Sequence, residues 1–190
     1  MKLSIALAGL LLASATAVQA IPVQWTTASG GNGHWYDVIS HRTLGQDAAA
    51  HAANQTFMGM TGYLVTITSA AENAFVTSLT SANLNVANPW IGGTDVNSEG
   101  TWVHNSGPEQ GTAMVYQNWL PGEPNNAAFN EDYIQIASTD GRWNDLFNTA
   151  YLNGYVVEYS GVTAVSIPAT LPLLATGLGL LALGRRRAMA

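Results

Sequence analysis

Helical patterns are confined to the first half of this 190-residue chain, and this order is the strongest constraint on its fold. The alanine-rich stretch 46–57 predicts one helix. Ser69 followed by Glu72 has the form of a capping box, and it predicts a second helix that continues to about Leu79. From Trp90 onward only short strand patterns remain, separated by loops rich in Gly, Pro, Asn and Asp. Helices first and strands later predict an α+β domain.

Short strands are predicted where aromatic and β-branched residues alternate or cluster. The predicted strands are 35–39, 64–67, 90–92, 101–104, 133–137 and 155–159. A long loop around Pro121 to Asn130 separates the fourth strand from the fifth. Such a loop counts against a compact domain unless it is functional or is held in place by a ligand.

The N-terminal segment 1–20 has the composition of a secretory signal. It carries one charge at Lys2, then an apolar run, and it ends in the small side chains around Ala20. This pattern predicts export with cleavage after Ala20.

The C-terminal segment 167–190 contains prolines, an apolar stretch from Leu171 to Leu183 and a closing arginine cluster, 185–187. It resembles the PEP-CTERM tails of bacterial exported proteins, which an exosortase removes. The usual Val-Pro-Glu-Pro motif is Ile167-Pro168-Ala169-Thr170 here, without a glutamate. A plain membrane anchor with cytoplasmic arginines is the alternative, although the apolar stretch is close to the lower limit for a span. Both predict at least transient membrane anchoring.

The segment between these ends is strongly acidic. It has two arginines against twelve carboxylates, which gives a formal net charge of −10. Such a surface repels phosphate backbones and anionic headgroups, so nucleic acid is not an expected partner. The chain has no cysteine. The core must therefore form without disulfides, and thiolate chemistry is excluded.

Oxygen-bearing side chains are concentrated between residues 118 and 145. Glu123-Pro124-Asn125-Asn126 lies in the long loop, Glu131-Asp132 follows it, and Trp143-Asn144-Asp145 comes next. Carboxylate and amide oxygens are the donors that calcium prefers, since it takes six to eight hard oxygen ligands. The sequence therefore predicts a calcium site on this loop.

The order of the elements, together with Trp90-Ile91-Gly92-Gly93 and the Glu-Pro-Asn and Trp-Asn-Asp motifs, resembles the C-type lectin domain. The resemblance covers roughly residues 33–160, which leaves 21–32 as a lead and 161–166 as a linker. It implies a C-type lectin-like α+β fold with two helices, short antiparallel sheets and a long calcium-binding loop.

The resemblance also implies two sets of calcium ligands. The principal site, which would hold the sugar as well, consists of Glu123, Asn125, Glu131, Asn144 and Asp145. The auxiliary site consists of Asp95, Glu99, Asn126 and Asp132. Pro124 is expected to be cis, aiming its neighbours at one ion.

This chain departs from the family pattern in two ways. The two usual disulfides are missing, and Ala52 with Val157 and Tyr133 with Asn148 stand at their places. One extra residue lies between Asn126 and Glu131. An apolar pair can replace a buried disulfide by packing, whereas loss of a loop staple should make the loop more dependent on calcium for its order.

The function implied by the resemblance is calcium-dependent binding of carbohydrate by an exported, cell-surface or extracellular protein. The Glu-Pro-Asn order is typical of members that bind mannose, glucose, fucose or N-acetylglucosamine, and an exopolysaccharide is a further expected partner. The alternative is a calcium-stabilised adhesion or matrix protein whose partner is a protein. Sequence motifs of hydrolases, metalloproteases and phosphate-binding loops are absent, so no enzymatic activity is expected.

Trp90, Trp119 and Trp143 are expected in the core rather than stacked on sugar. The four histidines are His34, His41, His51 and His104, and they have no close metal-ligand spacing. They are therefore expected to be solvated or structural.

Overall fold

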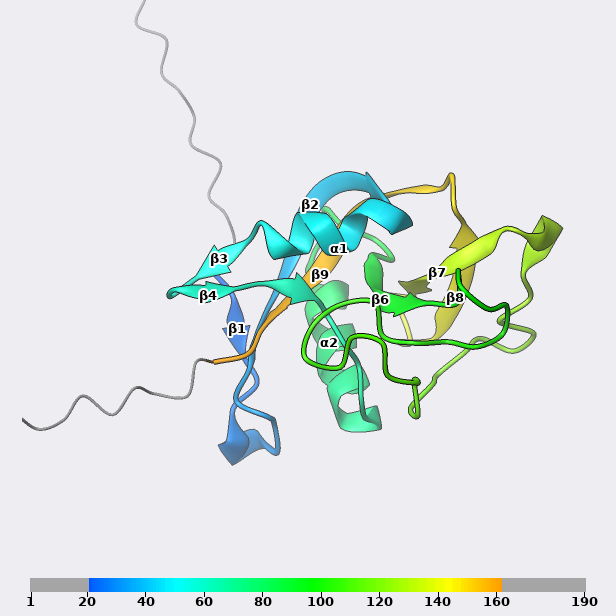
Figure 1. Cartoon of the computed structure of the whole chain (residues 1–190). Helices are drawn as coiled ribbons and strands as arrows, with labels where there is room; N and C mark the ends of the chain where they lie inside the picture. The colour runs from blue at the N-terminus through cyan, green and yellow to red at the C-terminus, as the bar shows by residue number, and fades with distance from the viewer. Residues whose placement is uncertain (1–20, 162–190) are drawn as a thin grey trace, which may run out of the picture. The chain divides into compact units, whose positions relative to one another are not determined.

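The computed structural model describes residues 21–161. A long antiparallel pair of strands brings the two ends of this region together (Figure 1). Strand β2 is Trp35–Leu44 and strand β9 is Tyr151–Tyr159. Trp35 lies opposite Tyr159, and Leu44 lies opposite Tyr151. The strands predicted at 35–39 and 155–159 are therefore confirmed, and both are longer than expected.

The remaining strands extend this pair into one seven-stranded sheet. Its order is β1-β2-β9-β6-β7-β8, with β5 paired to β9. The added strands are β1 Val23–Gln24, β5 Tyr63–Leu64, β6 Trp90–Thr94, β7 Glu131–Ile136 and β8 Trp143–Phe147. A separate hairpin is formed by β3 Thr56–Phe57 and β4 Met60–Thr61. The segment 21–32, expected as a lead, thus supplies a strand of the sheet.

The strand pairs of the sheet are antiparallel, as expected, with one exception. Strand β6 runs parallel to β9, with Trp90 opposite Tyr155. Parallel neighbours need a long connection between them, and here residues 95–150, which include β7 and β8, join β6 to β9. The sheet is therefore mixed.

Two helices are present, as predicted. Helix α1 is Gly45–Ala53, so it ends before the predicted boundary at 57, and the β-branched and aromatic pair Thr56–Phe57 forms β3 instead. Helix α2 is Ala70–Ala82. Two short 3₁₀ turns, η1 Thr27–Ser29 and η2 Ala127–Phe129, lie in loops.

The capping box of α2 is only half formed. The Ser69 hydroxyl accepts a hydrogen bond from the Glu72 amide at 3.2 Å, as the motif predicts. The Glu72 carboxylate does not return to Ser69, because it accepts from the Thr68 amide at 2.8 Å and from the Tyr36 hydroxyl at 2.7 Å. Glu72 therefore links α2 to β2.

Two predicted strands are shorter in the structure. The segment 64–67 contributes only Leu64 to β5, and 101–104 contributes single bridges from Val103 to Thr94 and Ala113. Strand β8 was identified in the sequence only as a motif. Its residues mix core and polar side chains, so no strand pattern is visible in the sequence. The strand forms because it pairs with β7.

The core consists of two clusters of buried apolar side chains. One contains Tyr36, Val65, Ile91, Trp102, Ile134, Trp143 and Val156, among others. The other contains Ala48, Ala52, Leu64, Trp90, Tyr155, Val157 and Tyr159. Trp90 and Trp143 are fully buried, which confirms their core role, and Trp119 is partly buried against the first cluster. Ala52 and Val157 belong to the same cluster, as expected for an apolar substitute of a disulfide.

A buried polar network joins β2, α2 and β9 beside the first cluster. Glu158 is 2% exposed, and its Oε1 lies 2.6 Å from Nδ1 of His34. The Tyr36 hydroxyl lies 3.2 Å from the same carboxylate. The hydrogen bond to Glu158 raises the pKa of His34, whereas burial raises the pKa of Glu158. The network satisfies polar groups that would otherwise be costly to bury.

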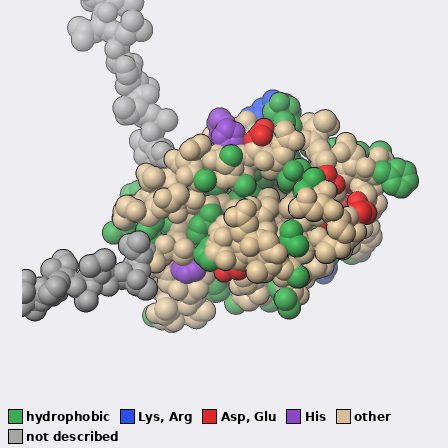
Figure 2. Space-filling model, viewed as in Figure 1, with side chains coloured by type: hydrophobic (Ala, Val, Ile, Leu, Met, Phe, Trp, Pro, Cys, Tyr) green, Lys and Arg blue, Asp and Glu red, His purple; other side chains and the backbone are tan. Residues whose placement is uncertain are grey.

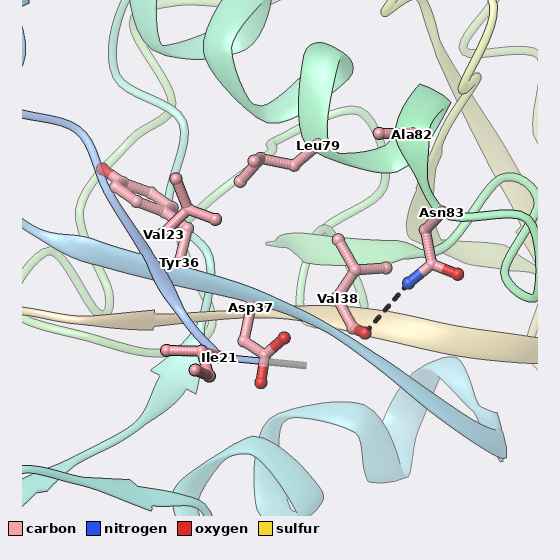
Figure 3. A pocket seen from close by; sticks show the side chains of 8 residues that line it. All are labelled: Ile21, Val23, Tyr36, Asp37, Val38, Leu79, Ala82 and Asn83. Atoms are coloured by element: carbon pink, nitrogen blue, oxygen red, sulfur yellow. Dashed lines mark hydrogen bonds between the residues drawn. The ribbon is translucent and has the colours of Figure 1, made fainter. Parts of the chain in front are cut away.

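A cavity of about 200 Å³ opens between β1, β2 and the end of α2 (Figure 3). Its walls are largely apolar, and Asn83 closes one side by donating to the Val38 carbonyl at 3.3 Å. Asp37 is its one carboxylate, and burial raises the pKa of this group to about 6. None of the predicted calcium ligands lines this cavity.

Among residues 21–161, no helix has the length and apolarity needed to cross a bilayer. The predicted signal segment 1–20 and the predicted sorting tail 167–190 lie outside the described residues.

Candidate calcium and ligand site

The hairpin of β7 and β8 fixes the positions of two predicted ligands. Ile134 lies opposite Asp145, and Ile136 lies opposite Trp143. Trp143 is buried in the core and donates its indole N–H to the Asn73 side chain at 2.8 Å. This anchor holds Asp145, two residues further along the strand, in a defined place at 1% exposure.

The long loop begins beside the same strand. The Trp143 amide donates to the Asn118 carbonyl, and the Leu120 amide donates to the Trp143 carbonyl, both at 2.8 Å. These bonds bring the start of the loop beside β8, at the end of the molecule where β7 and β8 lie (Figure 1). The Glu123–Pro124 peptide is cis, as expected from the resemblance.

Asp145 ties the loop to the hairpin. Its two carboxylate oxygens accept from the amides of Asn125, at 3.1 Å, and Asn126, at 2.8 Å. Glu131 makes a second tie, since its Oε2 accepts from the Ala127 amide at 2.6 Å. Both carboxylates are almost fully buried and face the Glu-Pro-Asn segment.

The carboxylate of Glu123 completes a cluster of negative charge. Its Oε2 is buried and has no hydrogen-bond partner among the described residues. Burial raises the pKa of Glu123, and its contact with the Asp145 carboxylate and the charge of Glu131 raise it further. Burial likewise raises the pKa of Glu131. Carboxylates in contact either share a proton or need a cation between them to stay ionised.

The two amides of the principal set are placed differently. Asn125 is exposed, and its side-chain amide works against the rise in the pKa of Glu123. Asn144 is half-buried on β8, opposite Gln135 and next to Asp145, and its side chain makes no hydrogen bond within residues 21–161. The structure thus gathers Glu123, Asn125, Glu131 and Asp145, with Asn144 adjacent.

The segment before Glu131, where the resemblance implies one extra residue, has an unusual backbone. Asn126, Ala128 and Phe129 have φ values of 44°, 54° and 58°, a region that residues other than glycine seldom adopt. The turn η2, which follows Asn126, leaves Phe129 94% exposed. Glu131 nevertheless points into the cluster, where its charge acts on Glu123.

The predicted auxiliary ligands form a second acidic group beside the first. Asp95 is buried, its Oδ2 accepts from the Gly100 amide at 2.9 Å, and its Oδ1 has no partner among the described residues. Burial raises the pKa of Asp95 to about 6, and the charges of Glu99 and Asp132 add to the rise. Asn126 joins the two groups, because its side-chain amide donates to Glu99 while its backbone amide donates to Asp145.

Asp132 is held by a residue whose role the sequence did not indicate. The Asn148 side chain accepts from the Asp132 amide at 3.1 Å and donates to the Asp132 carboxylate. The Asn148 amide also donates to the Asn130 carbonyl at 3.2 Å. Asn148 stands where the family's loop disulfide is expected, so hydrogen bonds staple the loop in its place. An asparagine in a loop gives no sequence signal for this role.

Replacing Asn148 with alanine is expected to lower the free energy of unfolding by about 1–2 kcal/mol, because the Asp132 amide and carboxylate lose their partners. The loss should be larger in chelator than in excess calcium, since a bound ion would also order the loop. Denaturant unfolding in the two conditions measures both values. Asn85→Ala, at an exposed asparagine, is the matched control. Equal effects of the two substitutions would contradict the staple.

The donors suit calcium better than a softer ion. Counting only carboxylates and imidazoles, the region from 21 to 161 has no group of three placed closely enough for a metal ion. The cluster instead combines carboxylates with amides and backbone groups, and it holds buried carboxylate oxygens without partners at Glu123 and Asp95. A hard cation with oxygen ligands fits these residues.

Comparison with known families identifies the domain. The family model described as the Lectin C-type domain matches residues 46–156. Halomucin of Haloquadratum walsbyi is 33% identical over 145 residues, which is 71% of this chain and 2% of that protein. The low affinity immunoglobulin epsilon Fc receptor of Mus musculus is 37% identical over 107 residues, covering 56% of this chain and 30% of the receptor. The chain thus spans only a minor part of these relatives.

Solved structures give the same result for the fold. The C-type lectin CEL-I from Cucumaria echinata superposes with a TM-score of 0.57 at 27% identity, covering 67% of this chain and 90% of that one. The carbohydrate-recognition domain of cow CD23, solved in the presence of a GlcNAc2Man3 oligosaccharide, gives a TM-score of 0.54 at 29% identity. That alignment covers 68% of this chain and 89% of the cow domain.

Proposed function

Because the chain belongs to the C-type lectin domain family, we propose that it is an exported protein that binds carbohydrate through a calcium ion on the long loop. The observation that carries this proposal is the contact between the Glu123 and Asp145 carboxylates, with a buried Glu123 oxygen left unpartnered. A calcium ion would satisfy that oxygen and neutralise the cluster. Glu123, Asn125, Glu131, Asn144 and Asp145 would hold the ion.

The chemistry of a neutral sugar explains why an ion is useful. Sugar hydroxyls compete with water for every hydrogen bond, so ordinary polar contacts give little net affinity. Calcium with open coordination positions can instead take two neighbouring hydroxyls directly. The ligating carboxylates then accept hydrogen bonds from these hydroxyls, and the exposed Asn125 amide can donate to one of them.

The proposed sugar class is that of mannose, glucose, fucose and N-acetylglucosamine, free or within an exopolysaccharide. The Glu-Pro-Asn order supports this choice, and the cow CD23 domain was solved in the presence of a mannose-containing oligosaccharide. One shallow site buries little surface, so we expect weak binding of a single sugar and stronger binding through many copies.

A second candidate is a calcium-stabilised adhesion or matrix protein that binds a protein partner. The exposed apolar side chains on and near the loops favour it, chiefly Phe129 at 94% and Val96 at 52% exposure. Apolar side chains that project from a polar loop are typical of a protein contact. In this case calcium would order the loops, and free sugar would not compete.

Calorimetric titration distinguishes these functions. Calcium is added to the chelated protein, and mannose and galactose are then titrated separately into the loaded protein. Calcium heat followed by mannose heat supports the proposed lectin, and a weaker response to galactose supports the sugar class. Calcium heat without any sugar heat supports the adhesion function. Absence of calcium heat would refute both.

Calcium binding is expected to weaken as the pH falls from about 7 to about 5, because protons compete for carboxylates with raised pKa values.

The stability of the calcium-free protein should change with pH in the opposite direction. The folded pKa of Asp95, about 6, lies above its ordinary value of 3.8, so the folded state holds a proton that the unfolded chain has lost. Calcium-free stability should therefore fall as the pH rises through this window. Thermal unfolding at several pH values, with calcium and with chelator, measures both slopes, and slopes of the same sign would contradict the assigned cluster.

A further inference from the structure

Two histidines on different elements lie against each other on the surface. His41 is on β2 and His51 is on α1, and their ring centroids are 4.7 Å apart at an interplanar angle of 63°. His41 is exposed and His51 is half-buried. Histidine surface is visible over the region of β2 and α1 in Figure 2. The sequence spacing of the two histidines does not reveal this pairing.

The separation of the rings matches that of two imidazoles on one metal ion. A zinc–nitrogen bond of about 2.0–2.1 Å, added to a ring radius of about 1.1 Å, places each ring centroid about 3.2 Å from the metal. Two such rings at ligand angles of about 90–110° have centroids about 4.5–5.2 Å apart. The observed 4.7 Å lies within this range.

The backbone of β2 is irregular at this position. Ser40 lies opposite Gly154 and Thr43 lies opposite Leu152, so His41 and Arg42 together face the single residue Asn153. Such a bulge adds a residue to one strand and changes the direction of its side chains. The irregularity occurs at the residue that contacts α1, and it fixes where His41 lies relative to that helix.

Packing against the Tyr155 ring restricts both histidine rings further. The buried Tyr155 stacks on the His51 ring, with centroids 6.2 Å apart and an interplanar angle of 23°, and it meets the His41 ring edge-on at 6.4 Å. Gln55 donates to the Tyr155 hydroxyl at 3.2 Å and to the His51 carbonyl at 3.4 Å. Packing of this kind reduces the rotamer freedom that a ligand would otherwise have to remove.

We propose that His41 and His51 form a surface site for a divalent transition-metal ion such as zinc or copper, separate from the calcium loops. Imidazole nitrogen suits these ions and not calcium, which prefers oxygen. The described residues offer no group of three imidazole or carboxylate ligands here, so water fills the remaining positions. Asp47, exposed one turn before His51 on α1, adds negative charge nearby, and the neighbouring Arg42 lies over the Tyr151 ring at 3.9 Å.

The test is a titration of Zn²⁺ into untagged protein that already holds saturating calcium, so that the acidic loops do not take up zinc. Cu²⁺ is followed in parallel by electron paramagnetic resonance, which detects coupling to imidazole nitrogen. The absence of cysteine excludes thiolate binding as a cause of either signal. His41→Gln is the principal variant because His41 is exposed, and Asp145→Asn is the matched control at the calcium site.

We expect one zinc ion per chain, and at least about a tenfold loss of zinc affinity in His41→Gln with calcium binding unchanged. Asp145→Asn should show the reverse, with calcium binding lost and zinc binding kept. The copper spectrum should lose one coupled nitrogen in His41→Gln. Zinc binding of equal strength in His41→Gln, or no zinc binding by the unmodified protein, would overturn the proposal and would leave the calcium site untouched.

Discussion

Replacement of Asp145 by asparagine is expected to weaken calcium binding about 100-fold and to remove sugar binding with it. Asp145 is 1% exposed, accepts from the amides of Asn125 and Asn126, and touches the Glu123 carboxylate. Asparagine supplies one oxygen instead of two and no charge, and its NH₂ group would face a loop amide. Calcium titration measures the loss directly.

The same substitution should have a different effect on the calcium-free protein. Removing the Asp145 charge removes a cause of the raised pKa of Glu123, so less repulsion remains in the empty cluster. Weaker calcium binding and less repulsion both reduce the effect of calcium on stability. The melting temperatures of Asp145→Asn in calcium and in chelator should therefore be nearly equal. Asp140→Asn is the control, because Asp140 is exposed in the turn before β8, where it accepts from the Arg142 amide at 3.0 Å. An equal loss of calcium affinity in both variants would contradict the assigned site.

Replacement of Trp143 by alanine is expected to lower the free energy of unfolding by about 3–5 kcal/mol. Trp143 is fully buried, donates its indole N–H to Asn73, and packs edge-on against Tyr116 and Trp119 with centroids 5.7 Å away in both cases. The loss combines a cavity, an unpartnered Asn73 oxygen and weaker attachment of the long loop. Denaturant unfolding in excess calcium measures it.

Trp119→Ala provides the comparison. Trp119 is only half-buried, and its indole donates to the nearby Gln117 side chain at 2.8 Å. We expect a loss of about 1–2 kcal/mol, in proportion to the smaller apolar area removed from water. If Trp119→Ala were the more destabilising of the two, the assignment of Trp143 as the principal anchor of the loop would be wrong.

Much of the fold was predictable because its signals are local. Ser69 and Glu72 mark the start of α2, and runs of aromatic and β-branched residues mark β2 and β9. The boundaries at Thr56–Phe57 and the strand β8 were not predictable in this way. The end of α1 depends on whether Thr56–Phe57 continues the helix or pairs with β4. Strand β8 depends on its pairing with β7.

The candidate site shows the same division. Its ligand types and their order along the chain follow from the motifs, because hard oxygen donors without thiols or imidazoles fit few cations other than calcium. The sequence could not show that Glu131 faces the cluster, since its position depends on left-handed backbone at Ala128 and Phe129. Nor could it show that the Asn148 side chain would hydrogen-bond Asp132.

The sequence by itself determined the α+β class, the domain family and the kind of atom that the long loop offers, because each depends on residue type and local order. Only the tertiary structure decided which of these atoms meet. The contact of Glu123 with Asp145, the clasp of Asn148 on Asp132 and the pairing of His41 with His51 each join different elements. Such contacts depend on strand register, a bulge and packing, which no single stretch of sequence specifies.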